Sequence, residues 1–160
     1  MMLLLLSHDA SVDGCGGHFG NALQAACFNG HEQAVRLLID HGASLDRKGR
    51  YRDALQAAVY SGNERITVEF LLQRGANVED RGGENGNALQ VACNAGHIDI
   101  VKLLLDSGAD VRSRGRNIGN ALQAASLAGH LDIVKLLVHR GIGVDEADGN
   151  SETALCLAAK

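Results

Sequence analysis

The chain has 160 residues, 46% of them apolar, and a formal net charge of −4 at pH 7. A net negative charge gives no overall attraction to nucleic acid or to an anionic membrane surface. Only 3% of the residues are aromatic and none is tryptophan. We therefore expect a thin core of leucine and alanine, in which small side chains let helices approach closely.

An apolar run, MMLLLL, opens the chain. It lacks the basic region and the cleavage site of a signal peptide, and it is far shorter than a membrane-spanning helix of about 20 residues. Residues 5–13 align instead with residues 104–112, where a leucine pair precedes a similar series of small and polar residues. We predict that the run is the end of a second helix whose first helix is missing.

One short sequence recurs along the chain at a nearly constant interval. Ala-Leu steps begin at residues 22, 54, 88, 121 and 154, which are 32, 34, 33 and 33 residues apart. A period of this length is typical of a solenoid, in which each repeat buries its apolar face only against its neighbours. Function is then expected where the copies differ.

The third copy predicts the structure of one repeat. Asn87 is a good N-cap for a first helix over residues 88–94, because its side-chain oxygen can accept a backbone N–H. Gly96 ends this helix, and a second helix over residues 97–107 carries apolar side chains three and four residues apart. Gly108 ends the second helix, and a polar loop leads to the next cap. Neither helix is long enough to be stable alone, so the copies must stack.

The pattern G-N-A-L-Q-A-A, followed by G-H and V-x-L-L-L-x-x-G-A-D-V, resembles the ankyrin repeat. It is similar to a form familiar from fungal multi-repeat proteins, with Asn, Ala and Gln in place of the Thr, Pro and His of the common T-P-L-H-x-A-A. The last copy, from Thr153 to Ala159, returns toward the common form. The resemblance covers nearly the whole chain. It implies an all-α solenoid of stacked helix-turn-helix units with projecting hairpin-like loops.

We predict a single array over residues 1–160. Its parts are the end of a truncated repeat (1–18), a repeat (19–50), an irregular repeat (51–85), two repeats (86–118 and 119–151) and the start of a truncated repeat (152–160). The irregular repeat has one extra residue between Gly62 and Gly75, and the loop from Gly42 to Ala54 is one residue short. Because both ends are incomplete, we expect further repeats to flank this segment in a longer protein.

The cysteines and histidines are expected to be structural. Cys27 and Cys93 occupy one repeat position, where other copies carry Val, Ser or Ala, so they should fill the core as small reduced residues. The spacing of the four cysteines fits no metal site, and unpaired thiols place the protein in the cytoplasm, with the nucleus as an alternative. His31, His97 and His130 all follow a mid-repeat glycine, which indicates a turn-bonding role. No nucleotide, hydrolase or zinc-protease motif is found, so we expect no enzyme activity, cofactor or metal.

The resemblance implies that a partner binds the concave face made by the loops and the exposed side of each first helix. The positions before the mid-repeat glycine vary between copies, and the predicted binding residues there are Phe28, Asn29, Tyr60, Ser61, Asn94 and Leu127. The loops add basic residues to the predicted surface: Arg47, Lys48, Arg50, Arg52, Arg112, Arg114 and Arg116. Arginine suits bidentate pairing with carboxylates, so an acidic protein or peptide is expected. The alternative is that these loops are only solvated.

The function expected from these residues is a non-catalytic protein–protein interaction module. The resemblance implies a parent of the large fungal type, with a nucleotide-binding, immune-receptor-like architecture. One alternative is a targeting appendage of an enzyme encoded outside this segment, and another is a structural spacer. Nucleic-acid binding is disfavoured by the net charge, the acidic residues among the loop arginines and the lack of an aromatic stacking platform.

Overall fold

The computed structural model describes residues 1–62, 65–80, 86–115, 119–147 and 152–159. They fall into two compact units, Met1–Asn77 and Val78–Lys160. The boundary lies inside the predicted irregular repeat. In each unit the regular structure is almost entirely helical, so the predicted all-α repeat architecture is confirmed.

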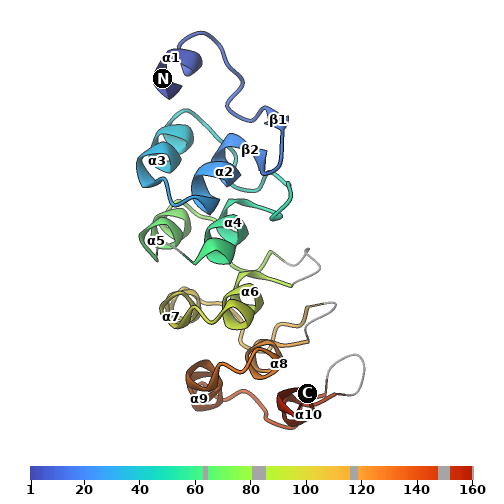
Figure 1. Cartoon of the computed structure of the whole chain (residues 1–160). Coiled ribbons are helices and arrows are strands. Elements are labelled where there is room, and N and C mark those ends of the chain that lie inside the picture. The colour runs from blue at the N-terminus through green and yellow to red at the C-terminus, as the bar shows by residue number, and fades with distance from the viewer. Residues whose placement is uncertain (63–64, 81–85, 116–118, 148–151, 160) are drawn as a thin grey trace. The chain divides into compact units, whose positions relative to one another are not determined.

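The first unit contains pairs of antiparallel helices joined by short turns. Helix α2 packs against α3 and α4, and α3 lies beside α5 (Figure 1). A two-stranded antiparallel pair precedes α2, with Gly16 opposite Gly20. The elements are α1 (Met2–Leu6), β1 (Cys15–Gly16), β2 (Gly20–Asn21), α2 (Ala22–Phe28), α3 (Glu32–Asp40), α4 (Ala54–Ser61) and α5 (Arg65–Gln73).

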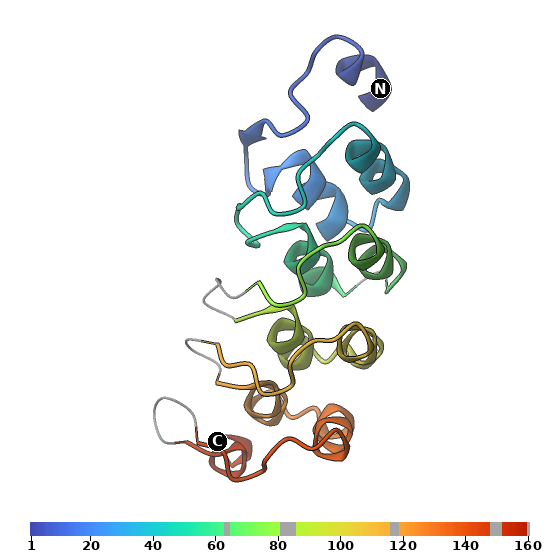
Figure 2. The same cartoon turned by 180° about the vertical axis from the view of Figure 1, so that it is seen from behind.

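The second unit repeats this arrangement. The first helices α6, α8 and α10 stack in order, and the second helices α7 and α9 form a second row beside them (Figure 2). The elements are α6 (Ala88–Ala95), α7 (Ile98–Asp106), α8 (Ala121–Leu127), α9 (Leu131–His139) and α10 (Ala154–Ala158). The loops that join a second helix to the next first helix are called fingers: residues 7–21 and 41–53 in the first unit, and 107–120 and 140–153 in the second.

The local signals in the sequence explain where these helices begin and end. The Asn87 side chain accepts a hydrogen bond from the backbone N–H of Gln90 at 3.2 Å, and Asn21, Asp53, Asn120 and Thr153 cap their helices in the same way. Gly96 ends α6 with φ of 81°, a left-handed conformation that glycine adopts without steric cost. These caps and stops confirm the helix boundaries predicted for the repeat within one or two residues.

The core runs through the middle of each helix pair. Within the second unit α8 lies between α6 and α10 and buries residues on both sides, whereas the second helices bury one stripe, such as Val101 and Leu104 on α7. Cys27 and Cys93 are buried, which confirms them as core residues, and burial raises the pKa of the Cys27 thiol to about 12. Such thiols stay protonated and unreactive.

The apolar start of the chain forms helix α1, and its assignment as the end of a truncated repeat stays a prediction. Its residues Leu3, Leu4 and Leu5 are more than half exposed. The extra residue predicted in the irregular repeat falls just before α5. That helix begins three residues after Gly62, whereas α7 begins two residues after Gly96. Residues 63–64 lie outside the described part of the chain.

Asp53 is a buried acidic cap, whereas Asn stands at this position in three other repeats. Burial raises the pKa of its carboxyl group, and this outweighs the hydrogen bond from Gln56 and the charge of Lys48. A raised pKa in the folded state favours protonation on folding, so stability falls as pH rises from the unfolded pKa through the folded one.

We therefore expect Asp53→Asn to raise the free energy of unfolding at pH 7, because asparagine keeps the cap and removes the buried charge. The gain over wild type should shrink as pH falls toward 4. Urea denaturation of both proteins across this pH range measures it. A gain that is the same at every pH would show that the charge is not responsible.

Candidate partner-binding surface

Four aromatic side chains of the first unit lie in one row, called the aromatic ladder: Phe19, Phe28, Tyr51 and Tyr60. Phe19 and Tyr51 come from the two fingers, each two residues before the cap of a first helix. Phe28 and Tyr60 come from the C-terminal ends of α2 and α4. The same two repeat positions therefore supply a ring in each of two adjacent repeats.

Neighbouring rings of the ladder lie at stacking distance. The ring centroids are 5.3 Å apart for Phe19 and Phe28, 4.7 Å for Phe28 and Tyr51, and 5.2 Å for Tyr51 and Tyr60. All three distances fall in the range of favourable aromatic pairs. Tyr60 is 50% exposed and the other three rings are partly exposed. The ladder is thus an accessible and preformed apolar surface.

The sequence indicated two of these rings and missed the other two. Phe28 and Tyr60 were predicted from their variable helix position, and the structure brings them within 6.3 Å of each other, with Tyr51 between them. Phe19 and Tyr51 were missed because they lie in fingers whose path the helical pattern does not determine. Their equal distance from the caps Asn21 and Asp53 was the signal that could have identified them.

Two of the four predicted basic residues of the second finger, Arg47 and Arg50, contact the first finger. The Arg47 guanidinium donates to Cys15 Sγ from Nε at 3.3 Å and from Nη2 at 3.2 Å. Arg50 Nη1 lies 2.8 Å from the ring nitrogens of His18, and the Arg50 guanidinium is 5.8 Å from the Tyr51 ring centroid. The positive charge of this finger is therefore held beside the aromatic ladder.

Lys48 and Arg52 are the other two basic residues predicted in this finger. Lys48 contacts the cap of α4, and Arg52 contacts α2. Lys48 Nζ is 3.9 Å from the buried carboxylate of Asp53. Arg52 is half-buried with φ of 74°, and its carbonyl accepts a hydrogen bond from Gln24 Nε2 at 3.3 Å. Arg52 thus has a structural role in the finger besides its charge.

The remaining predicted residues divide between the units. Asn29 and Ser61 follow the ladder rings of α2 and α4, whereas Asn94 and Leu127 are exposed at the ends of α6 and α8 in the second unit. Also in the second unit, Arg112 Nη2 donates to a backbone carbonyl at 3.4 Å, and Arg114 lies 3.7 Å from Glu146. Arg116 lies outside the described residues.

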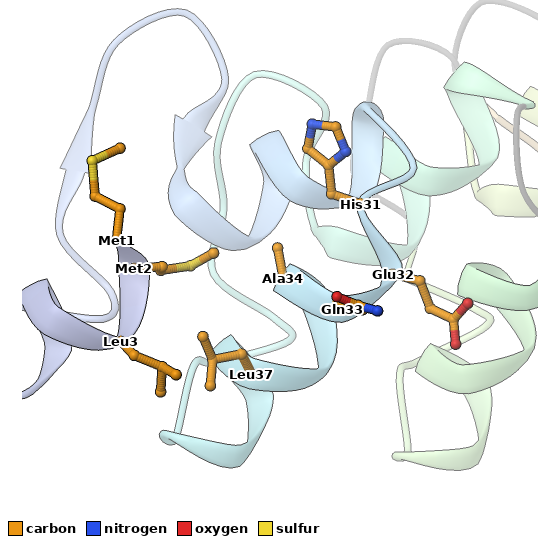
Figure 3. A pocket seen from close by; sticks show the side chains of 8 residues that line it. All are labelled: Met1, Met2, Leu3, His31, Glu32, Gln33, Ala34 and Leu37. Carbon is orange, nitrogen blue, oxygen red and sulfur yellow. The ribbon is translucent and has the colours of Figure 1, made fainter.

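A shallow groove lies between α1 and α3 in the first unit. Figure 3 shows Met2 and Leu3 of α1 pointing toward Ala34 and Leu37 of α3. The groove is lined by Met1, Met2, Leu3, His31, Glu32, Gln33, Ala34 and Leu37. Apolar side chains make up much of this lining, and the lining residues include no cluster of catalytic or metal-binding groups.

The repeated histidines begin the second helices. His130 Nε2 lies 3.2 Å from the carbonyl oxygen of Asn94 in the preceding repeat, so this histidine has the predicted turn-bonding role. Burial lowers the pKa of His97, and the nearby charge of His130 adds to this effect. Over the residues that the structure describes, no group of three or more His, Cys, Asp or Glu side chains is arranged to hold a metal ion.

Comparison with known families agrees with the helix pairs and fingers described above. A family model described as ankyrin repeats in three copies matches residues 1–82, 46–115 and 67–148. The chain belongs to the ankyrin repeat family. A search of curated proteins finds no match to it.

Ankyrin repeats are general protein–protein interaction modules, and their fold is typically non-catalytic. The candidate partner-binding surface of this ankyrin chain is therefore formed by the fingers and first helices, which carry the aromatic ladder. None of its described helices has the length and hydropathy needed to cross a membrane.

Proposed function

We propose that this ankyrin array binds a protein or peptide partner through the aromatic ladder and the second finger of its first unit. The proposal takes residues 1–160 as one array with the predicted repeat boundaries, flanked by further repeats and without catalytic activity. The single observation that carries it is the row of four accessible rings beside Arg50. Aromatic residues and arginine are the usual anchors of protein interfaces.

An acidic partner is favoured by the distribution of charge in the first unit. Helices α2 and α4 contain no charged residue, whereas the finger between the two repeats carries Arg47, Lys48 and Arg50 in four positions. Arg50 is held beside the ladder by His18, so a partner carboxylate could pair with it without much loss of side-chain entropy. In the second unit, Arg112, Arg114, Asn94 and Leu127 remain proposed contacts, and Arg116 is proposed from the sequence alone.

The wider context is proposed from the repeat type. The GNALQAA form favours a fungal multidomain protein of the nucleotide-binding, immune-receptor-like type, acting in the cytoplasm. A targeting appendage of an enzyme encoded outside this segment is the alternative. The flanking reading frame distinguishes the two, because each places a different domain beside the array.

We expect the double change Phe28→Ala with Tyr60→Ala to abolish partner capture, because it removes two of the four ladder rings while the caps of α2 and α4 stay intact. Immobilised wild-type and variant chains are compared for the proteins that they retain from an extract. Ile66→Ala is the matched control, since Ile66 is 57% exposed on α5, away from the finger side of its repeat.

Salt dependence tests the charge in this proposal. Arg50→Glu should weaken capture and reduce its sensitivity to salt, whereas Arg65→Glu on the exposed side of α5 should leave both unchanged. If the double alanine variant retains the same proteins as the wild type, the ladder is not the binding surface and the proposal is wrong.

A further inference from the structure

We infer that the aromatic ladder binds a proline-rich segment of a different protein in the polyproline II conformation, with an acidic residue of that segment beside Arg50. This inference rests on the proposed function and names the chemistry of the partner. It follows from the exposed edges and hydroxyl groups of the rings, from the hydrogen bonds already made by the backbone of the second finger, and from the absence of proline in residues 1–160.

The ladder offers ring edges and hydroxyl groups more than open ring faces. Tyr51 lies between Phe28 and Tyr60, with centroid distances of 4.7 and 5.2 Å, so the rings cover part of each other's faces. Such a row of ring edges offers apolar surface to compact, rigid side chains. Proline rings pack against aromatic side chains, and a polyproline II segment loses little entropy on binding because it is already extended.

The tyrosine hydroxyls supply the hydrogen bonds that such a segment needs. Among the residues that the structure describes, no group bonds to the hydroxyl of Tyr51 or Tyr60. A phenolic O–H that becomes covered needs an acceptor. A polyproline II segment has no internal hydrogen bonds, so its carbonyl groups are free to accept. The backbone carbonyls of a helical partner already accept hydrogen bonds within the helix, so they are less available to these hydroxyls.

Strand addition to the second finger is disfavoured, because its backbone is already bonded within the chain. The backbone N–H of Gly49 donates to the Arg52 carbonyl at 2.8 Å, and the N–H of Arg52 donates to the Gly49 carbonyl at 3.1 Å. The N–H of Asp53 donates to the Tyr51 carbonyl at 3.1 Å. Strand addition relies on free main-chain donors and acceptors, so recognition through side chains fits this finger better.

The occupant must come from outside residues 1–160. These residues contain no proline, so neither they nor a second copy of them can supply a proline-rich ligand. The charge of Arg50 next to Tyr51 adds a preference for an acidic residue in that ligand.

Single-stranded nucleic acid is the competing occupant. The sequence disfavoured it partly because no aromatic stacking platform was expected, and the structure does place four rings in one row. Base stacking, however, needs open ring faces, and the ladder rings are turned toward each other. The geometry therefore favours the peptide.

The test uses fluorescence anisotropy with the full chain and short fluorescein-labelled probes. The first probe is a peptide with two Pro-x-x-Pro motifs and flanking glutamates. The second has alanine at every proline, the third has glutamine at every glutamate, and the fourth is an oligothymidylate. Tyr51→Phe with Tyr60→Phe removes the two hydroxyls and keeps the rings, and Ile66→Ala is the control.

We expect the first probe to bind at least about tenfold more tightly than the alanine and glutamine peptides, because these lack every proline or every glutamate. A tenfold change corresponds to about 1.4 kcal/mol. The double phenylalanine variant should lose a similar factor, and Ile66→Ala should lose none. The inference is overturned if the proline peptide shows no saturable binding, if the alanine peptide binds equally well, or if the variant binds the proline peptide like the wild type. Tighter binding of oligothymidylate would assign the ladder to nucleic acid.

Failure of this inference is distinguishable from failure of the proposed function. If Phe28→Ala with Tyr60→Ala abolishes partner capture while the proline and alanine peptides bind equally, the ladder binds a protein of another chemistry. If the double alanine variant captures the same proteins as the wild type, the proposed surface itself is wrong.

Discussion

Replacing Gln90 by alanine is expected to lower the free energy of unfolding by about 3 kcal/mol, since a buried backbone group left without its partner costs about 1–3 kcal/mol. Gln90 is 1% exposed. Its Nε2 donates to the Ser113 carbonyl at 2.6 Å and to the Gly119 carbonyl at 3.1 Å, and its Oε1 accepts from the Asn87 N–H at 2.9 Å. The alanine variant removes all three partners at once.

Urea denaturation followed by circular dichroism measures this loss. Gln73→Ala is the matched control, because Gln73 is exposed at the end of α5 and a surface change of this kind shifts stability by at most about 0.5 kcal/mol. A Gln90 variant as stable as the Gln73 variant would mean that water replaces the lost bonds at no cost. The role assigned to the side chain would then be wrong.

The same glutamine position joins neighbouring repeats elsewhere in the chain. Gln24 Nε2 donates to the Arg47 carbonyl at 2.7 Å, and Gln123 Nε2 donates to the carbonyls of Glu146 and Glu152, both at 2.9 Å. In each case the acceptors belong to the finger that follows the glutamine's own pair of helices. The glutamine, which stands at this position in four of the five copies, thus fixes the finger that follows it, and in the first unit that finger carries Arg50 and Tyr51.

Features that depend on residues three or four positions apart could be predicted from the sequence. The cap at Asn87, the stop at Gly96 and the buried stripe of Val101 and Leu104 all follow from local hydrogen bonds and helical periodicity. The glutamine bonds could not be predicted in this way. Their acceptors lie 23 and 29 residues further along, in loops whose path no local rule determines.

The short second finger shows the same limit. The sequence predicts that one residue is missing, and the structure agrees: Gly49 pairs with Arg52, whereas Gly115 pairs with Gly119. The tighter turn leaves Arg52 at φ of 74° where Gly86 and Gly119 stand in other repeats at 80° and 70°. Counting residues identified the deletion. It did not show that the turn would place Tyr51 between Phe28 and Tyr60.

Phe70 is expected to be the second position with a large effect on stability. It is 5% exposed on α5 and lies between two guanidinium groups, with Arg36 at 4.2 Å and Arg74 at 4.5 Å from the ring centroid. Each guanidinium is itself held by a carboxylate, Arg36 by Glu32 at 2.7 Å and Arg74 by Asp40 at 3.1 Å. The ring therefore joins α3 to α5 through packing and through cation–π contacts.

Phe70→Ala should lower the free energy of unfolding by about 4 kcal/mol, the usual cost of removing a buried aromatic ring. Phe70→Leu separates the two contributions, because leucine occupies the aligned positions Leu37, Leu103 and Leu136 and fills most of the space. Losing only the cation–π contacts should cost about 1–2 kcal/mol. Urea denaturation of the two variants gives both values. If the alanine and leucine variants lose the same free energy of unfolding, the arginine contacts and not the packing of the ring connect α3 and α5. The larger loss expected for alanine would then be wrong.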